Sequence, residues 1–265
     1  MTNEITIVKI GGNIIDNAEK LHQFIKDFAQ LKEPKILVHG GGKIATEISK
    51  SLGIEAQLID GRRITDQETL KVVTMVYGGL VNKNIVAKLQ VFGCNALGLT
   101  GADANLIPAR KRPVTTIDYG FVGDIAEGVI NSEIIDQFLQ SELTLVFAPL
   151  THDGQGNLLN TNADTIASVL AVALAKKYQT QLIYCFEKKG VLAEISDENS
   201  VISQINKTQY EKLKADGVIA QGMIPKLDNA FEALQQGVRS VVICHADAIG
   251  QLAQENSTAG TTLIL

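Results

Sequence analysis

Six short runs of apolar, mostly β-branched residues recur along this 265-residue chain, and they constrain its fold more than any other feature. Runs of this length are typical of strands buried on both faces, as in a parallel sheet. The segments between them carry apolar residues at helical spacing. This alternation predicts an α/β fold with three layers, α/β/α, around an open, mainly parallel sheet. The runs are Ile5–Ile10, Lys35–Val38, Ala96–Leu99, Leu143–Ala148, Gln181–Phe186 and Ser240–His245.

Residues with helix-capping preferences mark where two of the helices should begin. Thr65 and Glu68 fit a capping box, which predicts a helix that starts there and ends near Gly93. Asn162 is the expected N-cap of a helix over Ala163–Lys177. Both helices fill gaps between apolar runs, as the alternating pattern requires.

Two glycine-containing stretches are more typical of β-hairpins that decorate the main sheet. Thr115–Ile130 is short, alternating and punctuated by glycine. Asp153 and Gly154 mark a second tight turn, with Leu158–Leu159 as the return strand. We expect both hairpins to lie near a ligand.

Composition and charge limit the classes of function. The net charge of -5 provides no basic surface for nucleic acid, and no apolar run is long enough to span a membrane. No signal peptide precedes the first strand, and the three cysteines have the wide spacing of buried, reduced thiols. We expect a cytoplasmic protein with a single domain over residues 1–265, divided into approximate lobes of residues 1–170 and 171–265.

Glycine loops follow the first two predicted strands. Lys9 ends the first strand and is followed by Gly11 and Gly12, whereas His39 precedes the run Gly40–Gly42 at the start of a helix. Backbone amides in such loops, and at the N-terminus of a helix, can bind a carboxylate or phosphate. A plain turn with a surface lysine is the alternative for the first loop. The second loop has more glycines than a strand-to-helix turn needs.

Three further segments carry polar side chains suited to an anionic ligand. Arg63 could bind a carboxylate through both of its terminal nitrogens. Asn160 could hydrogen-bond a ligand, and Asp164 lies in the first turn of the helix behind Asn162. Lys226 lies near the start of a helix, where the helix dipole disfavours a cation. The alternative explanations are that the adjacent arginines are solvated surface residues, and that Asn162 and Asp164 only stabilise the start of their helix.

In order along the chain, these segments resemble the amino acid kinase family, and within it the branch that acts on N-acylated glutamate. The resemblance extends from about Ile5 to Leu265. The segments that carry it are Lys-Ile-Gly-Gly, His-Gly-Gly-Gly, Gly-Arg-Arg-Ile-Thr, Gly-Leu-Thr-Gly-Ala-Asp, Asn-Thr-Asn-Ala-Asp and Gly-Met-Ile-Pro-Lys.

The resemblance implies transfer of the γ-phosphoryl group of ATP, which enters with Mg²⁺, to the side-chain carboxylate of N-acetyl-L-glutamate. Lys9 and Lys226 would be the catalytic lysines, and Asp164 would hold them rather than act as a base, because the attacking carboxylate is already ionised at neutral pH. The binding residues implied are Gly41, Gly42, Arg63 and Asn160 for the acyl-amino acid, and Gly11, Gly12, Glu187 and Gly222 for the nucleotide.

One segment departs from the family's pattern. Many relatives carry Ser-Asp-Val at the strand end that meets the nucleotide, whereas this chain has Phe186, Glu187 and Lys188. The acidic position is kept as Glu187, one methylene longer, but the small hydroxyl is replaced by an aromatic ring.

Other functions remain as alternatives. The acceptor could be another N-acylglutamate such as N-succinylglutamate, or the chain could be a catalytically silent regulatory protein of the same fold. The presence of both lysines and Asp164 disfavours the silent protein. Uridylate and carbamate kinases do not share the combination of Arg63 with Asn160–Asp164, and aspartokinases usually carry added regulatory domains. No Gly-x-Gly-x-x-Gly fingerprint supports a dinucleotide-dependent dehydrogenase.

The resemblance also implies a homodimer, for which the apolar stretch Leu70–Leu89 could supply the interface. Arginine-inhibited members of the family carry an extra N-terminal helix and a recognisable C-terminal segment. Here the first strand begins by Ile5, and His245 is not followed soon by the expected glutamate. We therefore expect a homodimer that free arginine does not inhibit.

Overall fold

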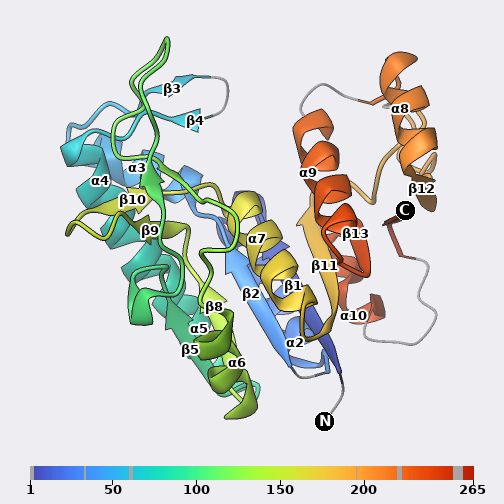
Figure 1. The fold of residues 1–265 in the computed structure, drawn as a ribbon, viewed down its shortest axis with the longest axis horizontal. Coiled ribbons are helices and arrows are strands. Elements are labelled where there is room, and N and C mark those ends of the chain that lie inside the picture. Colours follow the sequence, from blue (N-terminus) through green and yellow to red (C-terminus); the bar gives the residue numbers. More distant parts are fainter. Residues whose placement is uncertain (1–2, 33, 60–61, 195, 220–222, 253–258) are drawn as a thin grey trace.

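The predicted three-layer α/β fold is confirmed. The computed structural model describes residues 3–32, 34–59, 62–194, 196–219, 223–252 and 259–265. Its main feature is an eight-stranded sheet in the order β12-β14-β13-β11-β1-β2-β8-β5 (Figure 1). All neighbouring pairs in this sheet are parallel except β13 with β14. The strands are β1 Glu4–Ile10, β2 Lys35–His39, β5 Ala96–Leu99, β8 Thr144–Phe147, β11 Gln179–Phe186, β12 Gln204–Asn206, β13 Ser240–His245 and β14 Thr261–Ile264.

Helices cover both faces of the sheet. On one face pack α6, α7, α8 and α9, and on the other α1, α2, α3, α4, α5 and α10, with the π-helix η1 between α4 and α5. The helices are α1 Gly12–Ile15, α2 Ala18–Ala29, α3 Gly42–Ser51, α4 Gln67–Val73, η1 Thr74–Val81, α5 Asn82–Val91, α6 Ser132–Gln140, α7 Ala163–Ala175, α8 Lys207–Ala215, α9 Ile224–Gln235 and α10 Ile249–Leu252, with short 3₁₀ turns η2 Asp103–Asn105 and η4 Ala246–Ala248.

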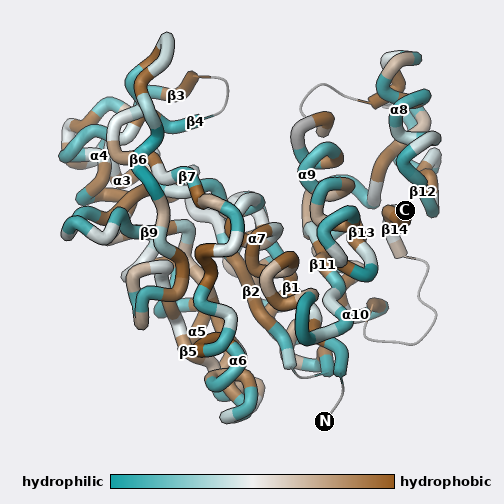
Figure 2. Tube along the Cα trace, viewed as in Figure 1, coloured by the Kyte–Doolittle hydropathy of each residue, from teal (hydrophilic) through white to brown (hydrophobic). Residues whose placement is uncertain are grey.

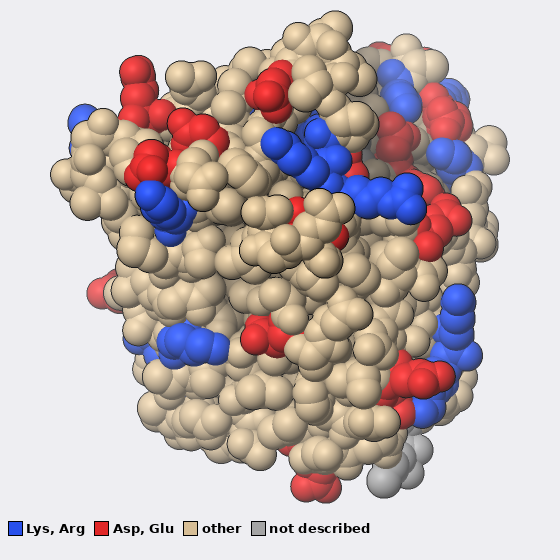
Figure 3. Space-filling view, turned by 60° about the vertical axis from the view of Figure 1, so that its left-hand side comes forward, with Lys and Arg blue, Asp and Glu red and all other residues tan. Residues whose placement is uncertain are grey.

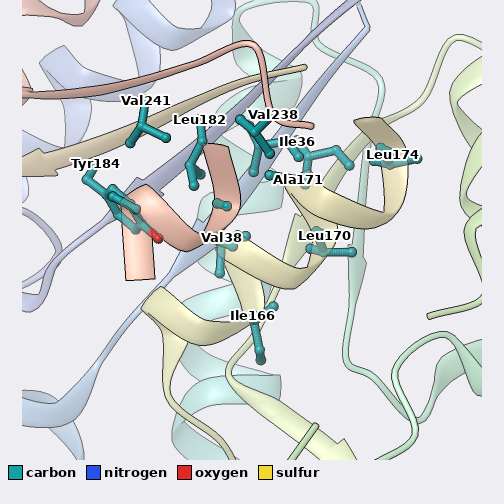
Figure 4. Close-up of a cluster of buried hydrophobic side chains, with 14 of the residues drawn as sticks. Ile36, Val38, Ile166, Leu170, Ala171, Leu174, Leu182, Tyr184, Val238 and Val241 are labelled. Carbon is teal, nitrogen blue, oxygen red and sulfur yellow. The ribbon is translucent and has the colours of Figure 1, made fainter. Parts of the chain in front are cut away.

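Side-chain alternation along β1 divides the core between the two faces. Ile5 and Ile7 belong to the cluster under α7 and α9, whereas Val8 and Ile10 belong to the cluster on the opposite face. Figure 4 shows the first cluster, where α7 packs its apolar side chains onto β2, β11 and β13. The strands of this sheet are mainly hydrophobic in Figure 2, as expected for a sheet buried on both sides.

Three pairs of short antiparallel strands among the described residues extend the molecule beyond the sheet. The hairpin of β9 (Leu150–His152) and β10 (Leu158–Asn160) confirms the predicted turn at Asp153. The hairpin predicted within Thr115–Ile130 is only partly correct, because its strands are β6 (Arg110–Lys111) and β7 (Gly123–Asp124). A third pair, β3 (Leu58–Ile59) with β4 (Arg62–Arg63), was not predicted.

The capping box predicted at Thr65 is wrong. The helix begins one residue later, and Asp66 is its N-cap, with Oδ1 accepting a hydrogen bond from Thr69 N at 2.8 Å. Thr65 is instead held by the 119–121 segment, because Thr65 N donates to Tyr119 O and Thr65 O accepts from Phe121 N. Asn162 is the N-cap of α7 as predicted, accepting from Thr165 N at 3.1 Å.

Within the part of the chain that the structure describes, no helix has the length and apolar character that a membrane crossing requires. Cys94, Cys185 and Cys244 are all buried free thiols. On the face drawn in Figure 3, lysine and arginine side chains are interspersed with acidic ones rather than gathered in one broad basic area.

His39, at the end of β2, is completely buried between the sheet and α5. Its Nδ1 lies 2.7 Å from Gly40 O and therefore carries the proton, while Nε2 lies 3.2 Å from Asn82 Nδ2 and accepts from it. Burial, opposed by the hydrogen bond to Gly40 and assisted by the charge of Lys83, lowers the pKa of His39 from 6.5 to about 4. The histidine is a neutral structural residue and not a base.

We predict that this histidine makes the fold sensitive to acid. The unfolded chain binds the His39 proton below about pH 6.5, whereas the folded protein binds it only near pH 4, so stability falls as the pH drops through this window. Between pH 7 and pH 5 the loss should be about 2 kcal/mol. Urea denaturation at both pH values measures it. His39→Gln should remove most of this pH dependence. The control His22→Gln, at an exposed histidine, should retain it. An equal change of unfolding free energy with pH in the wild type and in His39→Gln would contradict the assignment.

Candidate active site

The carboxyl ends of β1, β2 and β11 meet at one edge of the sheet, where the two glycine loops lie. Strand β1 is paired with β2 on one side and β11 on the other. The chain continues from β1 to β2 in one direction, and from β11 to β12 and β13 in the opposite direction. In open α/β sheets, ligands bind at such a switch in strand order. The first glycine loop follows β1 and the second follows β2, and each leads into a helix.

Three of the residues singled out from sequence lie together at this edge. Lys9 Nζ lies 2.7 Å from Asp164 Oδ1, and Lys226 Nζ lies 3.7 Å from Asp164 Oδ2. Lys9 comes from β1, Asp164 from the first turn of α7 and Lys226 from the first turn of α9. One carboxylate therefore lies between two ammonium groups from different halves of the chain.

The charges in this cluster perturb one another. Burial alone would raise the pKa of Asp164, but the ammonium groups of Lys9 and Lys226 outweigh burial and hold that pKa below its usual value. Burial lowers the pKa of Lys226, an effect that Asp164 opposes and Lys9 reinforces. At neutral pH the cluster holds two positive charges and one negative charge. Its net positive charge therefore favours the binding of an anion.

Phe186 lies against the same two ammonium groups. Its ring centroid is 3.7 Å from Lys226 Nζ and 5.4 Å from Lys9 Nζ, both within the range of a cation–π contact. The sequence marked Phe186 only as a departure from the family's pattern, because a ring contact between residues so far apart leaves no local signal.

One cavity, of about 600 Å³, opens beside the cluster toward the N-terminal part of the chain. Gly41, Gly42, Arg63 and Asn160, the residues expected to contact an acyl-amino acid, all line it, together with Asp164 and Lys226. The structure thus brings together the whole predicted acceptor set.

Arg63 is fixed in this cavity by the first turn of α3. Its Nη2 donates to Gly42 O at 2.9 Å and to Thr46 Oγ1 at 2.7 Å, while Nη1 is buried without a hydrogen-bond partner in the described chain. Asn160 Nδ2 donates to Thr65 Oγ1 at 2.9 Å. The side-chain oxygen of Asn160, Oδ1, stays available to a ligand. A buried guanidinium nitrogen without a partner is costly, and a ligand carboxylate would satisfy it.

A second cavity, of about 790 Å³, lies on the other side of the cluster toward the C-terminal part of the chain. Gly11, Gly12 and Glu187 line it together with Lys9, Phe186 and Lys226. Gly222, the fourth residue expected to contact a nucleotide, lies outside the described residues. Glu187 is exposed at the mouth of this cavity, in the loop that follows β11.

The two cavities meet at the cluster. Gly42, Leu58, Arg63 and Lys226 line both of them, whereas Lys9 faces only the larger and Asp164 only the smaller. The N-terminus of α3 also points here, and its cap residue Gly41 offers no side-chain hydrogen bond to the first-turn amides. The site can therefore hold two ligands, with anionic groups of both close to the lysines.

Sequence reasoning missed several residues of the site. Thr46 holds Arg63, Tyr77 packs on Gly41, and Arg112 lines the smaller cavity. Thr46 follows Gly42 by one helical turn, a spacing that could have indicated a shared face. Tyr77 and Arg112 reach the site from distant segments, and nothing local marks them.

Clusters of metal-binding side chains are not found in the site. In the described residues, no group of three or more His, Cys, Asp and Glu side chains is arranged to hold a metal ion.

Comparisons with known proteins identify the family and the fold. The model of the amino acid kinase family matches residues 4–245. An acetylglutamate kinase of Cytophaga hutchinsonii is 62% identical over 262 residues, which cover 98% of each chain. An acetylglutamate kinase of Bacteroides fragilis is 55% identical over 249 residues, covering 94% of this chain and 95% of the relative. Among solved structures, a carbamate kinase from Giardia lamblia bound to AMP-PNP superposes with a TM-score of 0.71 at 15% identity, covering 98% of each chain, and shows the same fold.

Proposed function

Because the chain belongs to the amino acid kinase family, we propose that the junction of the two cavities is where it transfers the γ-phosphoryl group of ATP to N-acetyl-L-glutamate. The reaction is that of an acetylglutamate kinase: it gives N-acetylglutamyl 5-phosphate and ADP, an acyl phosphate on the route to arginine. The observation that carries the proposal is the Lys9–Asp164–Lys226 cluster, which lies between two cavities. The smaller cavity contains Arg63, whose Nη1 has no hydrogen-bond partner in the described chain.

The acceptor would occupy the smaller cavity. The unpartnered Nη1 of Arg63 would take one of its carboxylates, and the amides of Gly41 and Gly42 and the side chain of Asn160 would bind the rest of the acyl-amino acid. Its side-chain carboxylate would then face the lysines at the junction. That carboxylate is ionised at neutral pH, so the attack needs no general base.

ATP would occupy the larger cavity, with its phosphates over Gly11 and Gly12 and its γ-phosphate at the junction. A carboxylate oxygen of the acceptor forms the new bond to phosphorus as the bond to the β-phosphate oxygen breaks, and ADP departs. Both reactants are anions, so the main barrier the protein can lower is electrostatic. Lys9 and Lys226 would screen the repulsion and stabilise the charge on the transferred oxygens.

Asp164 would orient the lysines in this scheme. Its carboxylate is already occupied by Lys9 at 2.7 Å, and its lowered pKa makes it a poor proton acceptor. Mg²⁺ would enter with ATP and neutralise phosphate charge, held mostly by phosphate oxygens and water. The proposed compartment is the cytoplasm, which suits an ATP-dependent enzyme whose three cysteines are free thiols.

N-succinylglutamate is a second candidate acceptor, and one observation favours it. Arg112 lines the smaller cavity and is held by Asp124 through Nε and Nη2. Its Nη1 is buried without a hydrogen-bond partner in the described chain. An additional carboxylate on the acyl group could reach this donor. The acetyl group has no charge to offer it.

The first prediction here concerns the acceptor. N-acetyl-L-glutamate should be phosphorylated with a kcat/KM at least about 100-fold above that of free glutamate, because the cavity would have to desolvate a charged α-amine. ADP release measured with N-acetyl-, N-succinyl- and free glutamate, with aspartate and UMP as controls, tests it. A higher kcat/KM for the succinyl compound would select the second candidate, and equal rates with free glutamate would contradict both.

The second prediction concerns Lys226. Lys226→Ala should lower kcat by about 100-fold or more, the scale of removing one fixed charge from a closed site, with unchanged thermal unfolding. Lys71→Ala is the matched control, since Lys71 is an exposed lysine on α4 paired with Glu68. A near-normal kcat in Lys226→Ala would show that this lysine is only a solvated helix residue.

The third prediction concerns assembly, which we propose is a homodimer. Met75 and Leu80 on η1 and Val91 on α5 are 55%, 46% and 77% exposed. Helix α5 packs against β5 at the edge of the sheet, and η1 packs against α5. Burying them against a second copy would remove apolar surface from water. Light scattering should give a mass of about twice 28.5 kDa. Met75→Lys combined with Leu80→Lys should give monomers, and a monomeric wild type would contradict the proposal.

A further inference from the structure

The two ammonium groups of the cluster are not held equally. Lys9 Nζ makes a close ion pair with Asp164 at 2.7 Å, and its side chain is 9% exposed. Lys226 Nζ lies 3.7 Å from the other carboxylate oxygen, beyond the usual length of a charge-assisted hydrogen bond, and its side chain is 30% exposed. Because one carboxylate faces two cations, another partner would help to stabilise the ammonium form of Lys226 at this half-buried position.

The ring of Phe186 is that partner in the structure. Its centroid lies 3.7 Å from Lys226 Nζ, closer than in any other lysine–ring contact found in the described chain. The ring is itself fixed. It ends β11 opposite His245 of β13, and it stacks on Tyr184 with a centroid distance of 6.0 Å and an interplanar angle of 12°.

Tyr184 connects this ring to the backbone of Asp164. It is 1% exposed, and its hydroxyl lies 3.3 Å from the backbone oxygen of Asp164, to which it donates. Asp164 and Phe186 are therefore held relative to each other by one buried side chain, and Lys226 is placed between them.

We propose that Phe186 is a positioning residue for the phosphoryl transfer: its ring holds the charged Lys226 over the junction of the two cavities until the phosphates of ATP take it over. This proposal rests on the function proposed above. An aromatic face attracts a cation without accepting its N–H groups as hydrogen bonds. All the donors of Lys226 that Asp164 does not use stay available to phosphate oxygens, whereas a second carboxylate at this position would compete with the phosphates.

The proposal makes the charge state of Lys226 depend on the ring. Burial already lowers the pKa of Lys226, and Asp164 of α7 and Lys9 of β1 act on it in opposite directions. The other charged groups around the larger cavity are Lys43 and Glu47 of α3, Arg63 of β4, and Glu187 and Lys188 after β11. Without the ring, the ammonium form would lose a favourable contact while remaining partly buried, so its pKa should fall further.

Phe186→Leu removes the aromatic face and keeps an apolar side chain of similar reach, whereas Phe186→Trp keeps the face. The first readout needs no turnover. In ¹³C NMR titrations of labelled lysine side chains, with Lys226→Ala used to assign the signal, the pKa of Lys226 should be lower by about half a unit to one unit in Phe186→Leu and close to wild type in Phe186→Trp.

The second readout is kinetic. Phe186→Leu should lower kcat at alkaline pH by about 3- to 10-fold and move the alkaline limb of the kcat profile to lower pH, with rescue in Phe186→Trp. In a Lys226→Ala background, Phe186→Leu should change kcat by less than about 2-fold, because the ring acts through that lysine.

Each failure has its own signature. An unchanged Lys226 pKa in Phe186→Leu, or an effect of Phe186→Leu limited to the KM for ATP, would overturn the proposal and leave Phe186 as a wall of the cavity. Loss of kcat of equal size with and without Lys226 would overturn it too. If the wild type does not phosphorylate an N-acylglutamate, the proposed function fails, and the titration still decides whether the ring holds Lys226.

Discussion

A buried carboxylate between two ammonium groups organises this molecule. The Asp164 side chain is 15% exposed, and Lys9 and Lys226 hold its pKa down against burial. Removing Lys9, the partner at 2.7 Å, would leave this carboxylate without its close ion pair, a loss that typically costs about 3–5 kcal/mol in a buried pair. The cluster therefore ties β1, α7 and α9 to one another. It also keeps a net positive charge, so a bound polyanion would complete it rather than disturb it.

The local structure around Asp164 explains how it reaches this place. Asn162 ends the turn after β10 and caps α7, which sets the helix start one residue before Asp164. In the first turn of a helix a carboxylate is favoured by the helix dipole, so the aspartate lies there at little cost. The opposite holds for Lys226, which lies in the first turn of α9 against the dipole. Its position is supported from outside the helix, by Asp164 and by the ring of Phe186.

The fold could be predicted from sequence where the signal is local, and the site only in part. The buried strands and the cap at Asn162 follow from patterns a few residues long. Thr65 could not be judged in this way, because its backbone pairs with residues near Gly120 and leaves capping to Asp66. The π-helix η1 could not be predicted either. Its Gly78 lies close to Leu150 and Thr100, which are distant in the sequence, so no local pattern indicates this packing. The grouping of Lys9, Asp164 and Lys226 came from the resemblance, because their spacing contains no geometric information.

The glycine run after β2 shows how one sequence feature can have more than one cause. Gly41 has a φ of +149°, and a Cβ there would lie 3.1 Å from the ring of Tyr77, so backbone conformation and packing both require glycine. At Gly42 neither reason applies, because a Cβ would meet nothing within 4 Å. The space a side chain would fill is open to both cavities, since Gly42 lines each of them. Packing within the protein therefore does not account for a glycine at position 42, whereas the proposed approach of a ligand to its backbone would.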